Sequence, residues 1–151
     1  MQAAAAVQDL EASEMIVWDD GTKKQRVYEI WEDNFHDPVS YANFYFNEVY
    51  GKNEVLLNEE MSADENLVKG MLHLNPYTLH VKGQPAEAKY IVGVATDEEY
   101  RRQGVMRELL VKTFQELRSR GELFTYLMPA DENYYLPFDF RFGMAQVEQE
   151  L

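Results

Sequence analysis

Residues 90–110 join an apolar strand, a short polar loop and a helix, and they constrain the fold more than any other stretch of the chain. The run Ile91 to Ala95 is apolar and rich in β-branched residues, which is typical of a strand buried on both faces. From Met106 onward, apolar residues recur at helical spacing. They are Met106, Leu110, Phe114 and Leu117, which fall on one stripe. The stretch therefore predicts a strand, a loop large enough to surround a phosphate group, and an amphipathic helix.

The predicted loop has the features of a phosphate site. The start of a helix exposes unpaired backbone N–H groups at the positive end of its dipole, which suits an anion. Gly104 has no Cβ, so a ligand can approach the backbone there, and Arg101 and Arg102 add positive charge beside those amides. The loop lacks the ending of a Walker loop and has only one glycine, unlike a dinucleotide fingerprint. The alternative is a surface Arg-Gly turn, and the flanking strand and helix favour the phosphate site over it.

Charge and length limit the function. The chain has 151 residues, enough for one ordinary domain and too few for two. Its 27 acidic residues outnumber 14 basic ones, and the formal net charge is −13. Such a surface repels nucleic acid and anionic membranes and attracts cationic substrates such as amines. An ordinary acidic surface explains the acidic residues, but the cluster of Arg101, Arg102 and Arg107 again indicates a bound anion.

Cysteine and histidine usage argues against metal chemistry. The chain has no cysteine, which excludes a disulfide scaffold, a thiol nucleophile and cysteine-ligated metal. His36, His73 and His80 lack the spacing of metal ligands, so each is predicted to be structural or exposed. No apolar run is long enough to cross a membrane, and the alanine-rich start lacks the basic region of a signal peptide. We expect a cytoplasmic protein with a leader at residues 1–14 and one domain at residues 15–151.

Before residue 90 the pattern predicts an edge strand, two helices and an antiparallel meander. The strands are Met15 to Trp18, Asn53 to Glu60, Leu67 to Leu74, Tyr77 to Val81 and Glu87 to Ala95, and the helices are Lys23 to Trp31 and Val39 to Tyr50. The first helix should break at Phe35 to Pro38, and Asn75-Pro76 should interrupt the strand that contains it. The second helix places Tyr41, Phe44 and Tyr45 on one face, and such a stripe is usually core. The alternative is that some of these rings line a cleft.

After the loop, the pattern predicts a strand–helix–strand unit and a short tail. The expected elements are a helix from Arg102 to Arg120 ended by Gly121, a strand from Leu123 to Met128, a short helix from Asp131 carrying Tyr134 and Tyr135, and a last strand that begins within Phe138 to Phe142. The connection is long enough for a right-handed crossover, so the strands before and after the long helix should be parallel neighbours.

The spacing Arg101-x-x-Gly104-x-Met106 resembles the pyrophosphate-binding signature of GNAT N-acetyltransferases, Arg/Gln-x-x-Gly-x-Gly/Ala, with Met106 in place of a small residue. The order of elements is also similar to the GNAT fold, an α/β (α+β) fold with a mixed central β-sheet flanked by helices, and this chain is expected to leave the last strand of that sheet unfinished. The chain most resembles the N-terminal GNAT domain of Eis (enhanced intracellular survival) acetyltransferases, although Asp139 stands where glycine is common. The segments that carry this resemblance are residues 43–46, 72–77, 90–96, 100–110 and 124–130, followed by Tyr134, Tyr135 and Phe138.

The resemblance implies a binding site for acetyl-CoA. In this family the pantetheine arm lies between the two parallel strands, which separate at a bulge. A backbone N–H near Val94 would polarise the acetyl carbonyl, as in an oxyanion hole. The residues implied to bind acetyl-CoA are Val94, Ala95, Thr96, Arg101, Arg102, Gln103, Gly104, Val105 and Met106.

The resemblance also implies direct attack of an amine on the acetyl group, with rate gained chiefly by positioning the two substrates. Tyr135 is implied to protonate the leaving thiolate, with Tyr134 as second choice, and the alternative for Tyr135 is a half-buried tyrosine that packs the short helix. The amine must first lose a proton. Three acids are possible bases, and each has the alternative of a solvated surface acid: Glu29, Glu32 and Glu48.

Two hypotheses follow for function. The first is an N-acetyltransferase that acetylates a primary amine of a cationic acceptor such as a polyamine, an aminoglycoside-like compound or lysine. The second is a non-catalytic module that binds acyl-CoA or serves in the assembly of a larger multi-domain protein, which the lack of an assigned base favours. A nucleotide phosphate binder is weaker, since nothing would bind a base or Mg²⁺. An exposed sheet edge would allow copies of the chain to pair as a homo-oligomer.

Overall fold

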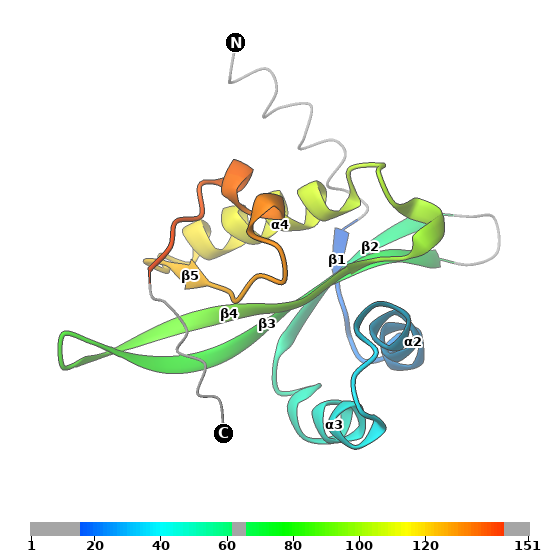
Figure 1. Cartoon of the computed structure of the whole chain (residues 1–151), viewed down its shortest axis with the longest axis horizontal. Coiled ribbons are helices and arrows are strands. Elements are labelled where there is room, and N and C mark those ends of the chain that lie inside the picture. Colours follow the sequence, from blue (N-terminus) through cyan, green and yellow to red (C-terminus); the bar gives the residue numbers. More distant parts are fainter. Residues whose placement is uncertain (1–15, 62–65, 144–151) are drawn as a thin grey trace, which may run out of the picture.

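A five-stranded mixed sheet lies between helices on both of its faces (Figure 1). The computed structural model describes residues 16–61 and 66–143. The strands follow each other across the sheet in chain order: β1 (Ile16–Trp18), β2 (Glu54–Met61), β3 (Asn66–Val81), β4 (Gln84–Thr96) and β5 (Thr125–Tyr126). Neighbours are antiparallel except β4 and β5, which are parallel. The predicted α/β fold, its edge strand and its parallel pair are thus confirmed, while the predicted leader and Met15 lie outside the described residues.

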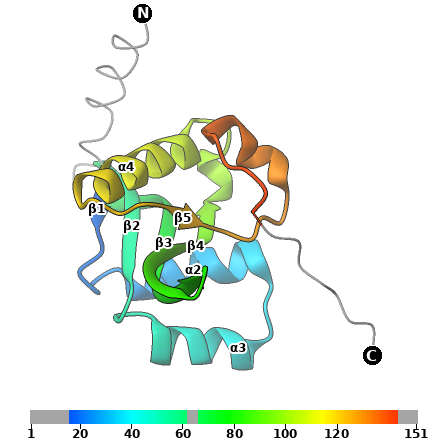
Figure 2. The ribbon, with the colours of Figure 1, turned by 90° about the vertical axis from the view of Figure 1, so that its left-hand side faces the viewer.

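The helices form two layers, which Figure 2 shows on opposite sides of the sheet. One layer contains α2 (Lys24–Phe35), α3 (Val39–Phe44) and a π-helical turn that continues α3 (Tyr45–Val49), and the other contains α4 (Val105–Ser119). The predicted break after α2 is confirmed, because His36 adopts a left-handed conformation with φ of 51° ahead of Pro38. Helix α2 runs four residues past the predicted end at Trp31.

Two apolar clusters fix these layers. Alternate residues of the strands point to opposite faces, so Leu57 and Met71 pack under α2, while Leu56 and Leu72 pack under α4. From the helices, Ile30 enters the first cluster. The second cluster receives Leu109, Leu110 and Leu117 of α4. Both faces of the sheet are therefore covered by apolar side chains.

The aromatic helix packs on a different face from the one predicted. Tyr45 and Phe46 are buried, whereas Tyr41 and Phe44 are 48% and 57% exposed. The inward positions also include Ala42, so the buried face combines Ala42 with Tyr45 rather than Tyr41 with Tyr45. The predicted shared face was wrong, because helical spacing alone does not determine which of two overlapping stripes meets the sheet.

Strand β3 corrects the prediction that Asn75-Pro76 interrupts a strand. It continues to Val81, and Pro76 lies opposite Lys89 of β4. The pairing of β3 with β2 ends where Leu74 meets Glu54, so beyond Leu74 the described residues pair β3 with β4 alone. Proline has no backbone N–H to donate. It is tolerated in this part of β3 because the strand has a partner on only one side there, so a backbone N–H is not needed at every position.

The end of the chain also differs from the predictions. The strand expected from Leu123 to Met128 shortens to β5, and the last strand expected within Phe138 to Phe142 is absent from the described residues. A 3₁₀ turn (Leu136–Phe138) begins with Pro137 in its first turn, and Asp139 follows in a left-handed conformation with φ of 66°. These backbone angles are incompatible with an extended strand at this point.

Strand β4 contains a bulge at Gly93. Met71 pairs with Ala95 and His73 pairs with Val92, so one residue of β3 faces two residues of β4. Gly93 has φ of 62°. A Cβ on Gly93 would lie 2.7 Å from Cζ3 of Trp31 and 2.8 Å from Cδ2 of His73. Only glycine therefore meets both the angle and the space available.

Candidate functional site

The edge of β4 that faces β5 is open on both sides of the bulge. The two strands pair only where Lys89 meets Thr125 and Tyr90 meets Tyr126. From residue 91 to residue 96, no strand among the described residues pairs with this edge of β4. Backbone N–H and C=O groups on such an edge can bond to an extended ligand. The predicted ligand residues Val94, Ala95 and Thr96 all belong to this open segment.

The predicted phosphate loop follows the open edge directly. Helix α4 begins at Val105, later than the predicted start at Arg102, because Gly104 takes a left-handed angle with φ of 82°. The first bond of the helix runs from the N–H of Glu108 to the carbonyl of Gly104, at 3.0 Å. The earlier amides of the turn have no intrahelical acceptor, which leaves them available to an anion. No atom lies within 4 Å of a Cβ built on Gly104, so the side from which a ligand would approach is unobstructed.

The start of α4 is anchored by the core. The side chain of Val105 is buried against Gly70 of β3. A Cβ added to Gly70 would lie 2.6 Å from Cγ1 of Val105. Met106 is half-buried on the same helix. Neither side chain is available to a phosphate, so any contribution of these two residues to anion binding comes from their backbone amides.

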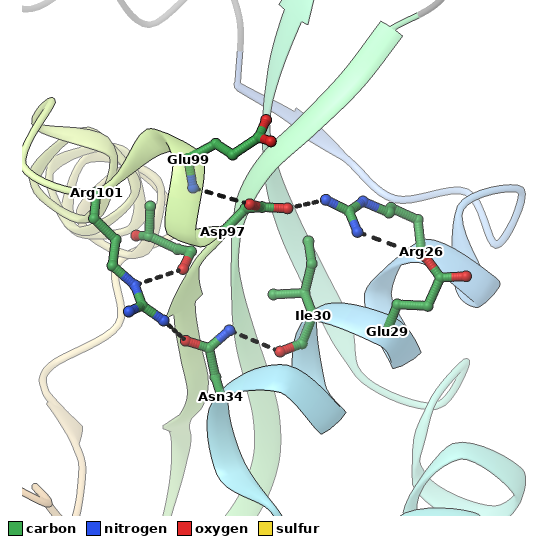
Figure 3. Close-up of polar contacts among 8 residues, drawn as sticks. Arg26, Glu29, Ile30, Asn34, Asp97, Glu99 and Arg101 are labelled. Atoms are coloured by element: carbon green, nitrogen blue, oxygen red, sulfur yellow. Dashed lines mark hydrogen bonds and ion pairs between the residues drawn. The ribbon is translucent and has the colours of Figure 1, made fainter.

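Two polar contacts tie the loop to α2 (Figure 3). Arg26 forms an ion pair with Asp97, which also accepts a hydrogen bond from the backbone N–H of Glu99. Arg101 donates to the side-chain oxygen of Asn34 at 3.0 Å. These partners are about seventy positions apart in the sequence, and no local pattern predicts them.

The predicted phosphate-loop side chains take different directions. The guanidinium of Arg101 lies toward α2, where it also donates to the carbonyl of Thr96 at 3.4 Å. Gln103 donates to the carbonyl of Glu99 at 3.2 Å and so braces the loop. Arg102 is exposed, in a left-handed conformation with φ of 61°. The loop therefore presents backbone amides and exposed Arg102, while Arg101 and Gln103 bond to the protein itself.

A pocket of about 300 Å³ lies against the bulge, on the face covered by α2 and α3. Its lining consists of aromatic side chains, one carboxylate and bulge backbone, from Trp31, Phe35, Asp37, Tyr41, Val92 and Gly93. The indole N–H of Trp31 donates to Oδ2 of Asp37 at 3.0 Å. The sequence indicated only that Asp37 ends a helix. The one signal in the sequence for a role of Asp37 in a site was its position between two helices rich in aromatic residues.

The three acids considered as bases lie elsewhere. Glu29 pairs with Arg26, Glu32 accepts from the hydroxyl of Tyr28, and Glu48 pairs with Lys52. All three are exposed, and none lines the pocket at the bulge. Their geometry is that of surface acids.

Tyr135 and Tyr134 differ in environment. Tyr135 is half-buried and packs edge-to-face on Phe140, with ring centroids 5.9 Å apart. Burial raises the pKa of Tyr135, and the neighbouring Tyr90 raises it further. The hydroxyl of Tyr135 is therefore protonated at neutral pH. Tyr134 is exposed on the predicted short helix, which starts where Asp131 caps the N–H of Asn133.

Four tyrosines extend from the pocket across the sheet, and we call them the tyrosine row: Tyr41, Tyr77, Tyr90 and Tyr126. The rings of Tyr77 and Tyr90 are 6.0 Å apart, and those of Tyr90 and Tyr126 stack at 5.1 Å. Burial raises the pKa of Tyr41 most, and the Asp37 carboxylate and Tyr77 raise it further by smaller amounts. An aromatic surface therefore continues from the pocket toward the separating strands, and the alternative of aromatic rings along a cleft holds for Tyr41.

A largely buried polar cluster packs against Trp31, which lines the pocket. The hydroxyl of Tyr45 lies 3.0 Å from Nδ1 of His73, and Asn53 donates to Asn75 at 2.8 Å. Burial lowers the pKa of His73 to about 3, so this ring is neutral in the folded protein. The prediction that His73 is structural is confirmed, and His36 and His80 are exposed, as the same prediction allowed.

Within residues 16–61 and 66–143, no group of three metal-ligating side chains could hold an ion. Across the same residues, no helix has the length and apolar character needed to cross a membrane.

Comparisons with known proteins identify the same architecture. Residues 19–143 match the family model described as an acetyltransferase (GNAT) domain. The fold is similar to that of a probable N-acyltransferase from Enterococcus faecalis, with a TM-score of 0.71 and 15% identity over 82% of this chain and 31% of that chain. No curated protein sequence matches the chain.

Two other solved structures are similar over nearly their whole length. One is a predicted acetyltransferase from Clostridium acetobutylicum solved with acetyl-CoA, with a TM-score of 0.72 and 14% identity over 89% of this chain and 94% of that chain. The other is glucosamine-6-phosphate N-acetyltransferase from Arabidopsis thaliana, with a TM-score of 0.62 and 14% identity over 89% of this chain and 97% of that chain. At such low identity these likenesses show the fold.

Proposed function

This chain belongs to the GNAT acetyltransferase family, and we propose that it transfers an acetyl group from acetyl-CoA to a primary amine of a cationic acceptor. The ammonium group of the acceptor first loses one proton to solvent, and the neutral amine then attacks the thioester carbonyl directly. The C–N bond forms, the C–S bond breaks, the thiolate takes a proton from Tyr135, and the proton that the new amide nitrogen loses returns to the tyrosine. One observation carries the proposal: the open edge of β4 connects a helix start suited to phosphate with a pocket suited to an amine. Two substrates bound at the two ends of this edge would have their reacting groups near Gly93, and positioning of this kind supplies much of a transfer rate.

The residues along this edge fit acetyl-CoA. The pantetheine arm would bond to the backbone of Val94, Ala95 and Thr96, as an added strand bonds to a sheet edge. The pyrophosphate would bind at the start of α4, where amides converge and Gly104 leaves space. The proposed contributors there are Arg101, Arg102, Gln103, Gly104, Val105 and Met106, with Arg101 turning from Asn34 toward the phosphates.

Val94, Tyr135 and Asp37 would supply the chemistry. A backbone N–H near Val94 would donate to the acetyl oxygen as negative charge develops on it. Tyr135, which keeps its proton at neutral pH, would give that proton to the departing thiolate. The amine would enter from the pocket, which Asp37 makes negative, and the net charge of −13 would concentrate cations around the protein.

The remaining expectations rest on the sequence motifs. We propose one acetyltransferase unit from residue 15 to residue 151, most similar to the N-terminal domain of Eis proteins, in the cytoplasm. Among the described residues one edge of β3 is unpaired beyond Leu74, and we propose that this edge pairs with a second copy to form a homo-oligomer. Light scattering on a size-exclusion column tests the last point, and a strictly monomeric protein would contradict it.

Titration calorimetry with acetyl-CoA tests the proposed function. The variants are Gly104→Glu, which places a carboxylate at the start of α4, and Gly121→Glu, which places the same charge past its other end. Gly104 and Gly121 both have positive φ and open space around a Cβ, so their backbone strain is matched. We expect binding by the wild type and by Gly121→Glu, and at least about tenfold weaker binding by Gly104→Glu, because like charges repel at the phosphate site.

The outcomes separate the hypotheses. A folded wild-type chain that does not bind acetyl-CoA would refute the proposed function. Equal loss in Gly104→Glu and Gly121→Glu would refute the placement of the pyrophosphate. Binding of acetyl-CoA without turnover of any amine would favour the alternative, a non-catalytic acyl-CoA-binding or assembly module.

A further inference from the structure

The pocket at the bulge presents one carboxylate in a fixed position. Trp31 is 3% exposed, and its ring stacks on Tyr45 with centroids 4.5 Å apart. It also meets the edges of Phe35 and Phe46 at 5.0 and 5.7 Å. Because Trp31 cannot move freely, its hydrogen bond to Oδ2 holds Asp37 in place. The acid is thus preorganised to accept a ligand N–H without a further cost of ordering its side chain.

The charge of Asp37 is not balanced by the pocket wall. The lining contains no lysine, arginine or histidine, and the remaining side chains are aromatic or aliphatic. A carboxylate among apolar groups attracts a cation more strongly than one in water does. The rings of Phe35 and Tyr41 are partly exposed and can pack against the apolar part of a ligand. The site is therefore suited to an ammonium group.

Size and charge limit the rest of the ligand. A volume of about 300 Å³ is at the lower end of the range for small-molecule pockets, enough for a compact molecule with one or two rings. An extended polyamine or an aminoglycoside would bring further ammonium groups against aromatic walls that hold no second carboxylate, and this desolvation is costly. An aromatic ring would instead pack against Phe35 and Tyr41, and the tyrosine row continues that surface outward.

We propose that the acceptor is a small monocationic amine whose primary ammonium group is attached by a short chain to an aromatic ring, and that Asp37 determines this specificity by binding the ammonium group. The inference rests on the proposed function, since the pocket ends at Val92 and Gly93 beside the expected acetyl group. It narrows the acceptors suggested by the acidic composition, among which polyamines and aminoglycoside-like compounds carry several charges.

Fluorescence titration tests this proposal without any need for activity. The chain has two tryptophans, and Trp18 is partly exposed away from the pocket lining. In a Trp18→Phe background, the emission of Trp31 reports occupancy of the pocket it lines. The probes are phenethylamine, the uncharged 2-phenylethanol and spermidine, each titrated with and without CoA. We expect phenethylamine to bind at least about tenfold more tightly than either of the other two probes, since only it matches both the ring surface and the single charge.

Two matched variants assign the effect to Asp37. Asp37→Asn keeps an oxygen for the Trp31 N–H but removes the charge, and we expect it to weaken phenethylamine binding at least about tenfold without affecting 2-phenylethanol. Asp33→Asn makes the same change on an exposed acid outside this pocket, and it should leave both affinities unchanged.

Several results would overturn the proposal. The first is equal affinity for spermidine and phenethylamine. The second is no binding of phenethylamine either with or without CoA. The third is an affinity for phenethylamine that does not change in Asp37→Asn. Acetyl-CoA binding combined with any of these would leave the proposed acetyl transfer standing and reject this acceptor class. Phenethylamine binding by a chain that does not bind acetyl-CoA would refute the acetyl transfer and, with it, the acceptor role.

Discussion

Gly93→Ala should destabilise the protein by two separate costs. The first is the left-handed backbone angle, φ of 62°, which costs a residue with a Cβ about 1–2 kcal/mol. The second is steric overlap, because the new Cβ would lie 2.7 Å from Trp31 and 2.8 Å from His73. Overpacking of this kind costs about 1–3 kcal/mol where neighbours cannot move, and both rings are buried. The sum, about 2–5 kcal/mol, is a large part of the 5–15 kcal/mol that holds a typical domain folded.

Two further glycines separate these costs in urea unfolding followed by circular dichroism. Gly51 has φ of 90° with nothing within 4 Å of a Cβ, so Gly51→Ala measures the backbone cost alone. Gly70 lacks a positive φ, but its Cβ would lie 2.6 Å from Val105 and 2.9 Å from the carbonyl of Ala95, so Gly70→Ala measures steric overlap. We expect the loss in Gly93→Ala to exceed the loss in Gly51→Ala by about 1–3 kcal/mol, at an unchanged m value.

A Gly93→Ala variant that loses no more stability than Gly51→Ala would refute this reasoning. It would mean that Trp31 and His73 yield easily, and that the bulge does not depend on close contact with their rings. The fixed position of Asp37 would then also lose its support, since Trp31 is the residue that holds it.

Three further predictions concern protonation, catalysis and charge. Burial lowers the pKa of His73 from 6.5 to about 3. Between these two pH values the unfolded chain binds one more proton than the folded protein, so the free energy of unfolding falls as pH falls. The fall is about 1.4 kcal/mol per pH unit well inside this pH range. Urea unfolding at pH 7 and pH 5 would compare the wild type with His73→Asn. The stability difference between the two proteins should be about 1–2 kcal/mol smaller at pH 5 than at pH 7. An equal difference at both pH values would contradict a buried neutral ring. Tyr135→Phe should lower the acetyl-transfer rate constant about 10²–10⁴-fold at unchanged acetyl-CoA affinity, whereas Tyr134→Phe should keep the rate, and an equal loss in both would reject the acid role. Arg26→Met should cost about 1 kcal/mol of unfolding free energy at low salt and less at 1 M NaCl, because its pair with Asp97 is partly exposed, and a cost independent of salt would argue against an electrostatic tie.

The sequence by itself determined the local conformations around the site. The apolar run Ile91 to Ala95, Gly104 and the helical period after it specify strand, turn and helix through torsion angles and side-chain spacing that neighbouring residues impose. The parallel partner of β4 also followed, since the helix between the two strands makes a connection long enough for a parallel crossover. The assignment to the GNAT fold came from these elements in order and from the motif that begins at Arg101.

Only the tertiary structure decided which side chains share an environment. Pro76 remains inside β3 because β2 ends opposite Leu74, which is a property of the sheet and not of the proline. Asp37 became a candidate for substrate binding only when the fold placed Trp31 and Gly93 of β4 beside it at one pocket. A side chain's chemistry depends on burial, charge and partners supplied by distant residues. Local sequence fixes periods and turns but leaves those distances unspecified, because the packing of helices on the sheet sets them.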